Sequence, residues 1–298
     1  MLKKNGFITI YSLVIIVFTI YIVMDTFVNS QVYEVVGNDE SNTNTTQKLE
    51  IGKVTKNSNL YIDDNIEIEL KEYAVENTQV YVADVKIKNS ELLKTAFANN
   101  SYGKNLTEKT SSIASSLNAI LAINGDYYGV QESGYVLKNG VVYRDTSAGD
   151  KEDLVIYKDG SFEIINEKDV DIYTLLSKGT YNILSFGPCL VENGVVSVNE
   201  KYEVAKVMTS NPRTAIGLID DLHYVFVVSD GRTSESEGLT LYELATFMQN
   251  RLGVQIAYNL DGGGSSSMYF NGELVNKPTT NGNKISERRV SDIVYIGY

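Results

Sequence analysis

Short apolar or alternating runs, separated by turn dipeptides, dominate the chain after about residue 60. Four Asn-Gly or Asp-Gly dipeptides each lie between two such runs, and these dipeptides accept the positive φ of type I′ turns. Each therefore predicts a β-hairpin. The predicted hairpins join 134–138 to 141–144, 154–158 to 161–165, 189–192 to 195–198, and 267–270 to 273–275. We expect a further pair, 214–219 and 222–228, to turn at Asp220-Asp221.

Two segments have helical periodicity instead. Thr240 and Glu243 have the spacing of a capping box, and Gly253 is a typical C-terminal stop. The inner face between them would carry Leu241, Leu244, Ala245, Met248 and Leu252. A second helix is predicted over about 108–118, with Ile113, Ala114 and Leu117 inward. Each leads into an apolar run and a polar loop, which predicts an α+β fold with β-rich mixed sheets, several hairpins and a few packed helices in one domain.

The N-terminus has the pattern of a membrane anchor. Residues 1–6 carry Lys3 and Lys4, and residues 7–24 are uncharged and rich in Ile, Val, Phe and Tyr, long enough to span a bilayer. A cleaved signal peptide is the alternative, but the run exceeds a typical h-region and no A-x-A-like site follows. Acidic residues and no Lys or Arg occupy 25–47, which predicts a single-pass signal anchor with a cytoplasmic N-terminus and an extracellular remainder.

The segment after the anchor changes in composition. Residues 25–59 are rich in Asn, Thr, Ser and Gln, with 41–46 at the centre, and can bury little apolar area. We interpret this segment as a flexible stalk that lifts the domain off the membrane. The folded domain is then expected to occupy residues 60–298.

Charge and rare residues exclude several functions. The chain has 38 acidic and 26 basic residues, a net charge of -12, which disfavours nucleic acid as a partner. Cys189 and His223 are the only residues of their types, which excludes disulfides and thiolate or His-rich zinc sites. Cys189 is expected to be a buried small hydrophobe, and His223 to be packed or at a sheet edge. The lack of disulfides is compatible with a bacterial cell surface.

The stretch from Asn259 to Ser267 is the first candidate for chemistry. It reads Asn-Leu-Asp-Gly-Gly-Gly-Ser-Ser-Ser and follows an apolar run, so it is expected to lie between ordered elements. Glycines allow close approach of a ligand, and amides and hydroxyls surround the carboxylate of Asp261. This is the chemistry of an anion or sugar cradle. A Gly/Ser turn without a ligand is the alternative, and the known phosphate-loop spacings are missing.

Other polar residues also occur where strands are predicted to begin or end. A rigid sheet presents such residues to a shared cleft, although each could instead cap a turn or pair with a surface charge. These residues are Asn124, Asp126, Arg213, Thr214, Asp230, Arg232 and Asp261, and Arg288 is a further candidate.

Six motifs, taken in order, resemble the phosphodiester glycosidase domain family. They are Asn124-Gly125-Asp126-Tyr127-Tyr128, Pro212-Arg213-Thr214-Ala215-Ile216-Gly217, Ser229-Asp230-Gly231-Arg232, Gly238-Leu239-Thr240, Asn259 to Ser266, and Glu287-Arg288-x-Val290. The resemblance covers about residues 73–298 and includes bacterial exopolysaccharide-related members. It implies a hydrolase, a glycosidase that cleaves sugar-1-phosphodiesters outside the cytoplasm, with a role in surface polysaccharide metabolism.

The residue types suit that chemistry. Cleavage at the anomeric carbon expels a phosphate monoester, so the site must stabilise phosphate charge and supply one carboxylate as nucleophile or base. We assign the carboxylate to Asp261 or Asp126, with Glu287 as a weaker candidate. The expected substrate-binding residues are Asn124, Tyr127, Arg213, Thr214, Asp230, Arg232, Gly262, Gly263, Gly264, Ser265, Ser266 and Arg288. Stacking on a sugar ring would fall to Tyr127 or Tyr128, since the chain has no Trp.

The sequence supports no cofactor. A divalent metal held by two carboxylates would be compatible with the site, but no ligand spacing indicates one. Two other functions use the same residues. One is a non-catalytic surface module that binds an anionic glycan, and the other is a glycosyl or phosphodiester transferase acting on a wall polymer.

Overall fold

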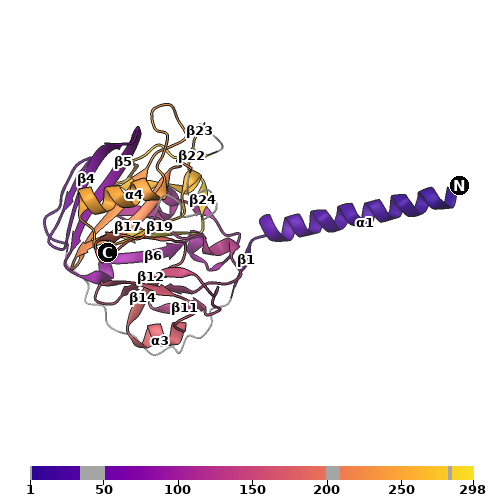
Figure 1. The fold of residues 1–298 in the computed structure, drawn as a ribbon, viewed down its shortest axis with the longest axis horizontal. Helices are drawn as coiled ribbons and strands as arrows, with labels where there is room; N and C mark the ends of the chain where they lie inside the picture. The colour runs from indigo at the N-terminus through magenta and orange to yellow at the C-terminus, as the bar shows by residue number, and fades with distance from the viewer. Residues whose placement is uncertain (1, 34–50, 199–208, 281–283) are drawn as a thin grey trace.

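Two antiparallel sheets packed face to face form the centre of the domain, and one long helix projects from it (Figure 1). This computed structural model describes residues 2–33, 51–198, 209–280 and 284–298. Within these residues every strand pairing is antiparallel, as expected for a chain rich in hairpins. The α+β, β-rich prediction is confirmed.

The described strands of the larger sheet number nine. Their spatial order is β16 (Val195–Val196), β15 (Cys189–Glu192), β19 (Ile256–Leu260), β17 (Arg213–Asp220), β18 (His223–Ser229), β5 (Thr78–Ile87), β4 (Ile66–Val75), β3 (Leu60–Ile62) and β2 (Thr55–Lys56). The facing sheet has five described strands. Their order is β21 (Glu273–Leu274), β20 (Met268–Phe270), β9 (Leu121–Asn124), β25 (Asp292–Ile296) and β6 (Leu93–Phe97).

Apolar side chains between the two sheets make the main core. Phe226 and Tyr258 from the larger sheet and Leu121, Ile123 and Val294 from the smaller one belong to one buried cluster. Because alternate residues of a strand point to opposite faces, each sheet also has an outer apolar face. The helices α4 (Leu241–Phe247) and α2 (Thr110–Ser116) cover these two faces. The centre of the domain therefore has four layers, helix, sheet, sheet and helix.

A subsidiary unit lies beside the two main sheets. It contains a sheet ordered β13 (Phe162–Asn166), β12 (Glu152–Tyr157), β14 (Thr180–Leu184), the hairpin β10 (Val136–Lys138) and β11 (Val141–Arg144), and α3 (Ile172–Ser177). These elements share a separate buried cluster that includes Leu137, Val155 and Leu175. The remaining pairs are β1 (Gln31–Val32) with β7 (Gly103–Lys104), β22 (Thr279–Thr280) with β23 (Lys284–Ile285), and β24 (Arg289–Val290) with β8 (Glu108–Lys109).

All five predicted hairpins are confirmed. The Asn-Gly and Asp-Gly turns join β10 to β11, β12 to β13, β15 to β16 and β20 to β21. The turn between β17 and β18 lies at Asp221-Leu222, one residue later than the predicted Asp220-Asp221, because Asp220 still pairs with His223. Cys189 is buried, as predicted. His223 is partly buried, with Nε2 2.7 Å from Oδ1 of Asp84.

The predicted helices exist but are shorter. Thr240 and Glu243 form the capping box, and a π-helical turn, η4 (Met248–Leu252), extends α4 to Gly253 in the left-handed region. The second helix begins at Thr110 rather than near 108, because Glu108 and Lys109 pair with β24 instead. Tertiary strand pairing thus overrides local helical preference there. Short 3₁₀ turns occur at η1 (Ser90–Leu92), η2 (Ala98–Asn100), η3 (Tyr128–Val130) and η5 (Gly263–Ser265).

The N-terminal helix α1 spans Leu2–Phe27 and contains the predicted anchor segment 7–24. Its stretch Thr9–Thr26, 18 residues, is long and apolar enough to cross a membrane, a property that a signal sequence shares. Of the expected stalk 25–59, the centre at 41–46 lies outside the described residues. The described flanks contribute β1 and β2, which pair with β7 and β3. The stalk and the domain boundary at residue 60 stay predictions.

Candidate functional site

Asn124 joins the two main sheets at the edge where the candidate residues gather. It ends β9, and its Nδ2 donates to the carbonyl of Asp261, 2.6 Å away, just after β19. Its Oδ1 accepts from Thr214 Oγ1 at 2.8 Å and from the amide of Ser267 at 3.2 Å. Asn124 and Thr214 are fully buried. The geometry therefore makes these two residues supports for the loop that carries Asp261.

Asp261 pairs with Arg288 at the surface of this edge. Nη2 of Arg288 lies 3.0 and 3.2 Å from the two carboxylate oxygens, and Ser265 Oγ donates to Oδ2 at 2.5 Å. Nε of Arg288 donates to the same hydroxyl at 2.9 Å. Burial raises the pKa of Asp261 above its usual value, and the charge of Arg288 opposes that shift. The side chains are 13% and 43% exposed, so both groups are within reach of a ligand.

Two further arginines pack on the glycines that follow Asp261. A Cβ at Gly262 would lie 2.9 Å from the carbonyl of Pro212 and 4.0 Å from Cδ of Arg213. A Cβ at Gly263, where φ is +64°, would lie 2.8 Å from Nη2 of Arg232. Only glycine allows this approach. The glycine-rich turn therefore brings the backbone against the guanidinium group of Arg232, which follows β18, and near the Cδ atom of Arg213, which begins β17.

The electrostatic surroundings of these arginines suit an anion. Among the described residues, the guanidinium of Arg232 bonds only neutral oxygens, Asn211 Oδ1 at 3.1 Å and the carbonyl of Thr279 at 3.4 Å. Nε of Arg213 donates to the carbonyl of Leu239 at 2.8 Å. Burial, and then the positive charge of Arg232, lowers the pKa of Arg213 to about 10. Two cations held this close would be stabilised by a bound anion.

The amides of the glycine-rich turn are less available than expected. The amide of Gly263 donates to the carbonyl of Pro212 at 2.8 Å, that of Ser265 to Gly262 at 3.3 Å, and that of Ser266 to Gly263 at 3.2 Å. These bonds form because the loop closes into the turn η5 against β17. The amides of Gly263, Ser265 and Ser266 are therefore already bonded within the protein.

Asp126, the other candidate carboxylate, lies in a buried ionic cluster. Oδ2 is 3.0 Å from Nζ of Lys138 and accepts from the amide of Ser185 at 3.0 Å. The same Nζ is 2.8 Å from Oδ2 of Asp292, and Asp292 Oδ1 accepts from the amide of Asp126 at 2.9 Å. The three side chains are at most 2% exposed. In this geometry Asp126 faces protein rather than solvent.

Burial and mutual repulsion govern the protonation of that cluster. Burial, and then the negative charge of Asp126, raises the pKa of Asp292 to about 7. Burial works against the charge of Lys138, but the two carboxylates raise its pKa above the usual value. Two carboxylates around one ammonium carry an excess negative charge, which a proton on Asp292 removes.

Glu287 lies at the start of α2. Its carboxylate accepts from the amide of Ser111 at 3.0 Å and from the Ser111 hydroxyl at 2.5 Å. Lys109, the N-cap residue, makes no such bond through its own side chain. Glu287 thus caps α2 from a distant part of the chain, a position that favours an anion.

The other predicted site residues are divided between support and surface. Asp230 is buried and accepts from Tyr81, Asn276 and the amide of Lys277, so it holds the segment after β21. The Ser266 hydroxyl is buried and without a hydrogen-bond partner among the described residues, and Gly264 packs against Thr280. Tyr127 is 41% exposed beside the site, whereas Tyr128 is buried and stacks on Tyr102.

Sequence reasoning missed three residues of this region. Lys138 is buried in the structure. In the sequence it is the one charged residue of an apolar run before the Asn139-Gly140 turn, and that position could have indicated a buried ion pair. Asp292 precedes the C-terminal apolar run and joins Asp126 only through tertiary structure, and Asn211 binds Arg232 from just before Pro212. Among the described residues no three His, Cys, Asp or Glu side chains are arranged to hold a metal ion.

Comparisons with known proteins agree on one family. The family model "Phosphodiester glycosidase" matches residues 117–297. The chain is 31% identical over 204 residues to an uncharacterised SPbeta prophage-derived protein, YomE, of Bacillus subtilis strain 168, covering 66% of this chain and 31% of that protein. It is 32% identical over 102 residues to mouse N-acetylglucosamine-1-phosphodiester alpha-N-acetylglucosaminidase, covering 30% of this chain and 19% of the enzyme. The chain thus spans about a third or less of these curated relatives.

A solved structure has the same fold. The catalytic domain of zebrafish N-acetylglucosamine-1-phosphodiester alpha-N-acetylglucosaminidase matches with a TM-score of 0.63 at 20% identity, covering 84% of this chain and 88% of that one. At this identity the likeness supports the fold.

Proposed function

Because the chain belongs to the phosphodiester glycosidase family, we propose that it hydrolyses the glycosidic bond of a sugar-1-phosphodiester. We further propose that the reaction takes place outside the cell membrane, with α1 as a signal anchor, and serves surface polysaccharide metabolism. The observation that carries the proposal is the packing of Arg213 and Arg232 on the glycines directly after the accessible carboxylate of Asp261.

In this proposal the arginines bind the phosphate. Guanidinium forks match the oxygens of a phosphodiester, and their positive charge stabilises the phosphate monoester as it leaves. Arg232, whose described partners are neutral oxygens, contributes most of this charge. Arg288 contributes both to phosphate binding and to the position of the carboxylate, because it can hold a phosphate oxygen while it keeps its bond to Asp261.

Asp261 acts at the anomeric carbon, either as nucleophile or as the base that activates water. Its raised pKa increases its basicity, and Arg288 and Ser265 fix its position. Asn124 and Thr214 hold the loop, and Tyr127 offers an exposed ring for the sugar. We give Asp126 a supporting role, because its carboxylate lies in a buried cluster with Lys138 and Asp292.

A comparison of two substrates, with the free sugar measured as the product, tests the proposal. The full chain in detergent is offered a nitrophenyl sugar phosphodiester and the matching nitrophenyl glycoside without phosphate. Arg232→Gln should lower kcat/KM on the phosphodiester by about 10- to 100-fold, the loss of charged hydrogen bonds, and leave the slow glycoside reaction unchanged.

Arg251→Gln is the matched control, since Arg251 is an exposed arginine on η4. It should leave both rates unchanged. An equal loss by Arg232→Gln on both substrates would contradict the phosphate role. Saturable binding of the phosphodiester by the parent chain, without release of free sugar, would instead support the non-catalytic glycan-binding module.

A further inference from the structure

The end of α1 is fastened directly to the domain. Nδ2 of Asn105 donates to the carbonyls of Thr26 and Asn29 at 3.1 and 3.0 Å, and the Ser30 hydroxyl donates to the carbonyl of Asn105 at 3.1 Å. Three residues after the helix, β1 pairs with β7. Figure 1 shows α1 leaving the domain on the side that carries β1 and β24. The helix therefore fixes which face of the domain meets a membrane.

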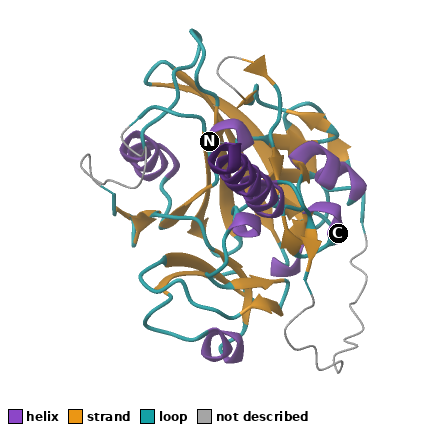
Figure 2. Cartoon of the chain, turned by 90° about the vertical axis from the view of Figure 1, so that its right-hand side faces the viewer, coloured by secondary structure: helices purple, strands orange, loops and turns teal. Residues whose placement is uncertain are grey.

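The candidate site lies close to this attachment. The amide of Asn105 donates to the carbonyl of Gly129 at 3.3 Å, and the amide of Asp261 donates to the carbonyl of Gly125 at 3.2 Å. A five-residue loop, 125–129, thus connects the helix attachment to the site. Even fully extended, five residues span only about 18 Å, so Asp261 lies within about 30 Å of the last turn of α1. Figure 2 looks onto this face along the helix.

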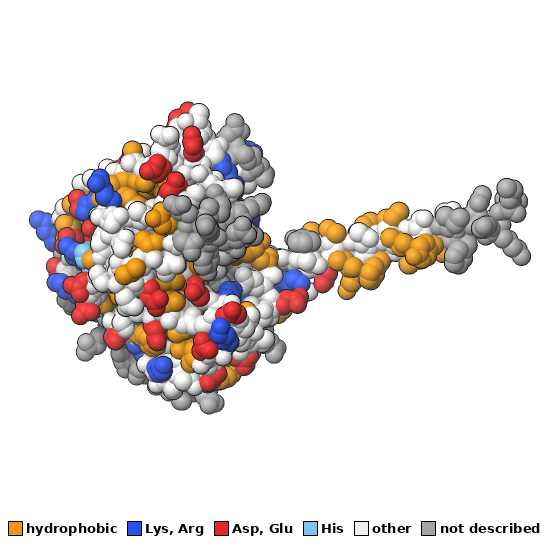
Figure 3. All heavy atoms as spheres, in the orientation of Figure 1, with side chains coloured by type: hydrophobic (Ala, Val, Ile, Leu, Met, Phe, Trp, Pro, Cys, Tyr) orange, Lys and Arg blue, Asp and Glu red, His pale blue; other side chains and the backbone are white. Residues whose placement is uncertain are grey.

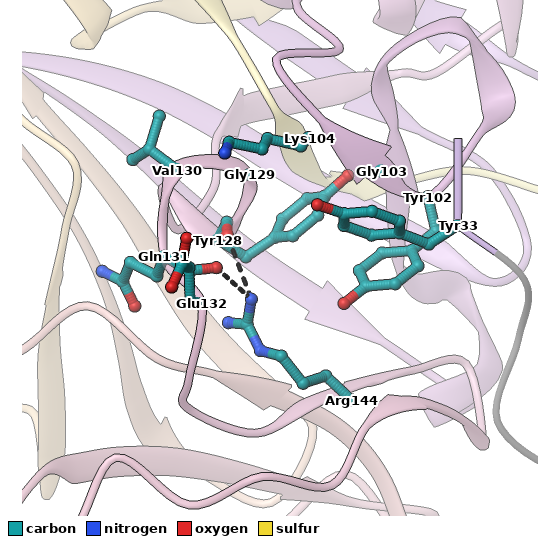
Figure 4. Close-up of a pocket in the computed structure, with 10 residues that line it drawn as sticks. All are labelled: Tyr33, Tyr102, Gly103, Lys104, Tyr128, Gly129, Val130, Gln131, Glu132 and Arg144. Carbon is teal, nitrogen blue, oxygen red and sulfur yellow. Dashed lines mark hydrogen bonds between the residues drawn. The ribbon is translucent and has the colours of Figure 1, made fainter. Parts of the chain in front are cut away.

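Apolar side chains are exposed both in the connector after α1 and in the loop that leads to the site. Val28, Val32 and Tyr33 lie in the connector after α1, and Tyr127 and Val130 in the site loop, with exposures between 40% and 69%. Tyr33 and Val130 both line a small cavity beneath the connector, where Tyr33 stands against Tyr102 (Figure 4). We call these five residues the membrane-side patch. Val and Tyr side chains of this kind suit the interface between lipid headgroups and hydrocarbon.

The patch is continuous with the helix that Figure 3 shows as an apolar rod outside the domain. If α1 spans the bilayer, the connector that follows it lies at the headgroup level, and β1 keeps the site loop at that level too. A long flexible tether would allow the site to reach substrates far from the membrane, but the bonds of Asn105 restrain the described connector.

We propose that the substrate is a sugar joined through a phosphodiester to a membrane lipid, such as a polyprenyl phosphate sugar. This inference rests on the proposed glycosidase function and on α1 as a membrane anchor. Water adds its oxygen to the anomeric carbon, the bond from that carbon to the phosphate oxygen breaks, and that oxygen leaves with the bonding electrons. The products are the free sugar, the lipid phosphate monoester and the proton released by water, which Asp261 accepts.

The geometry favours this substrate over a soluble or distant polymeric one. A lipid phosphodiester is confined to the bilayer surface, so an anchored site at that surface meets it at high effective concentration. The lipid chain can lie against the membrane-side patch while the phosphate reaches Arg232 and Arg288. The same phosphodiester chemistry in a soluble diester would gain nothing from the anchor.

The experiment compares two substrates with the full chain reconstituted in vesicles of phosphatidylcholine and phosphatidylglycerol. One is N-acetylglucosaminyl or glucosyl polyprenyl phosphate in the same vesicles, and the other is the soluble nitrophenyl diester of the same sugar phosphate. The first variant has a flexible Gly/Ser insert of about 20 residues between Val28 and Asn29, which frees the domain from the helix. It should lower the rate on the lipid substrate by about tenfold or more and leave the soluble substrate unchanged.

Point variants sharpen the result. Val130→Asn should lower the rate on the lipid substrate several-fold, because it places an amide at the lipid surface, and Val195→Asn is the control at an exposed valine in β16. If the insert lowers the rates on both substrates equally, or changes neither rate, the inference about the lipid substrate is overturned. Turnover of the soluble diester in that case still supports the proposed glycosidase function. Failure of the parent chain on both substrates overturns the proposed function itself.

Discussion

Two Asn-x-Asp sequences lie at the ends of two central strands, β9 and β19, and their carboxylates have opposite surroundings. Asn124-Gly125-Asp126 ends in a fully buried cluster with Lys138 and Asp292, whereas Asp261 of Asn259-Leu260-Asp261 meets a partly exposed arginine. The local sequences are nearly equivalent. Burial and the partner of each carboxylate make the difference, and for that reason we propose a supporting role for Asp126 and a chemical role for Asp261.

The two Asn-x-Asp sequences also depend on each other through hydrogen bonds. Asn124 belongs to the first sequence, but its amide holds the carbonyl of Asp261 in the second. The amide of Asp261 in turn donates to the carbonyl of Gly125. The buried cluster therefore fixes the loop against which the accessible carboxylate is positioned. A change in the cluster should alter stability first, and a change at Asp261 should alter chemistry first.

The largest effect should come from Asp261→Asn. This change keeps the shape of the side chain and removes the charge that acts at the anomeric carbon, so kcat on a sugar phosphodiester should fall by about 10²- to 10⁴-fold. Thermal unfolding should change little, because an amide can still accept from Ser265. Steady-state kinetics and a melting curve on the same preparation measure both. Full activity in this variant would move the catalytic role to another carboxylate.

Lys138→Met should produce the reverse pattern. It leaves Asp126 and Asp292 buried without their cation, which should lower the free energy of unfolding by about 3–5 kcal/mol. Urea unfolding measures the loss, and the fraction that remains folded should keep most of its turnover. Lys158→Met, at an exposed lysine near a turn, is the control. A stable but inactive Lys138 variant would contradict the supporting role of the cluster.

The smallest effect concerns pH. The folded state raises the pKa of Asp292 to about 7, so the folded chain binds an extra proton between the unfolded value and pH 7. Stability from this group is present below about pH 4 and is lost as pH rises through about 7. The loss between pH 4 and pH 8 is on the order of 4 kcal/mol. Asp292→Asn should remove this part of the pH dependence, as urea unfolding at pH 5 and pH 8 would measure.

A matched change outside the cluster gives the reference for that measurement. Asp150 is exposed and binds Lys168, and Asp150→Asn should leave the slope between pH 5 and pH 8 as it is in the parent chain. If Asp292→Asn and Asp150→Asn have the same slope as the parent, Asp292 is ionised throughout and the buried cluster carries its negative charge.

Much of this molecule follows from local sequence. The Asn-Gly and Asp-Gly turns determine their own backbone conformation, so four of the hairpins could be predicted from them. The fifth, β17 to β18, could be predicted from its two apolar runs, but its turn lies one residue later than expected. Thr240 and Glu243 are three residues apart, so the capping box and the helix α4 could be predicted as well. The order of the motifs identified the family, and the glycines after Asp261 indicated a close approach of other groups.

Tertiary structure alone decided which groups meet. Lys138 binds Asp292 across 154 residues of sequence, and Glu287 caps α2 across 176 residues. It also directed the amides of the glycine-rich turn to carbonyls of the protein and placed Arg213 and Arg232 over that turn. Short-range rules act between neighbours in the chain, whereas burial and ionic partners depend on how the two sheets pack. For that reason the sequence named both Asp126 and Asp261, and only their surroundings in the fold separate their proposed roles.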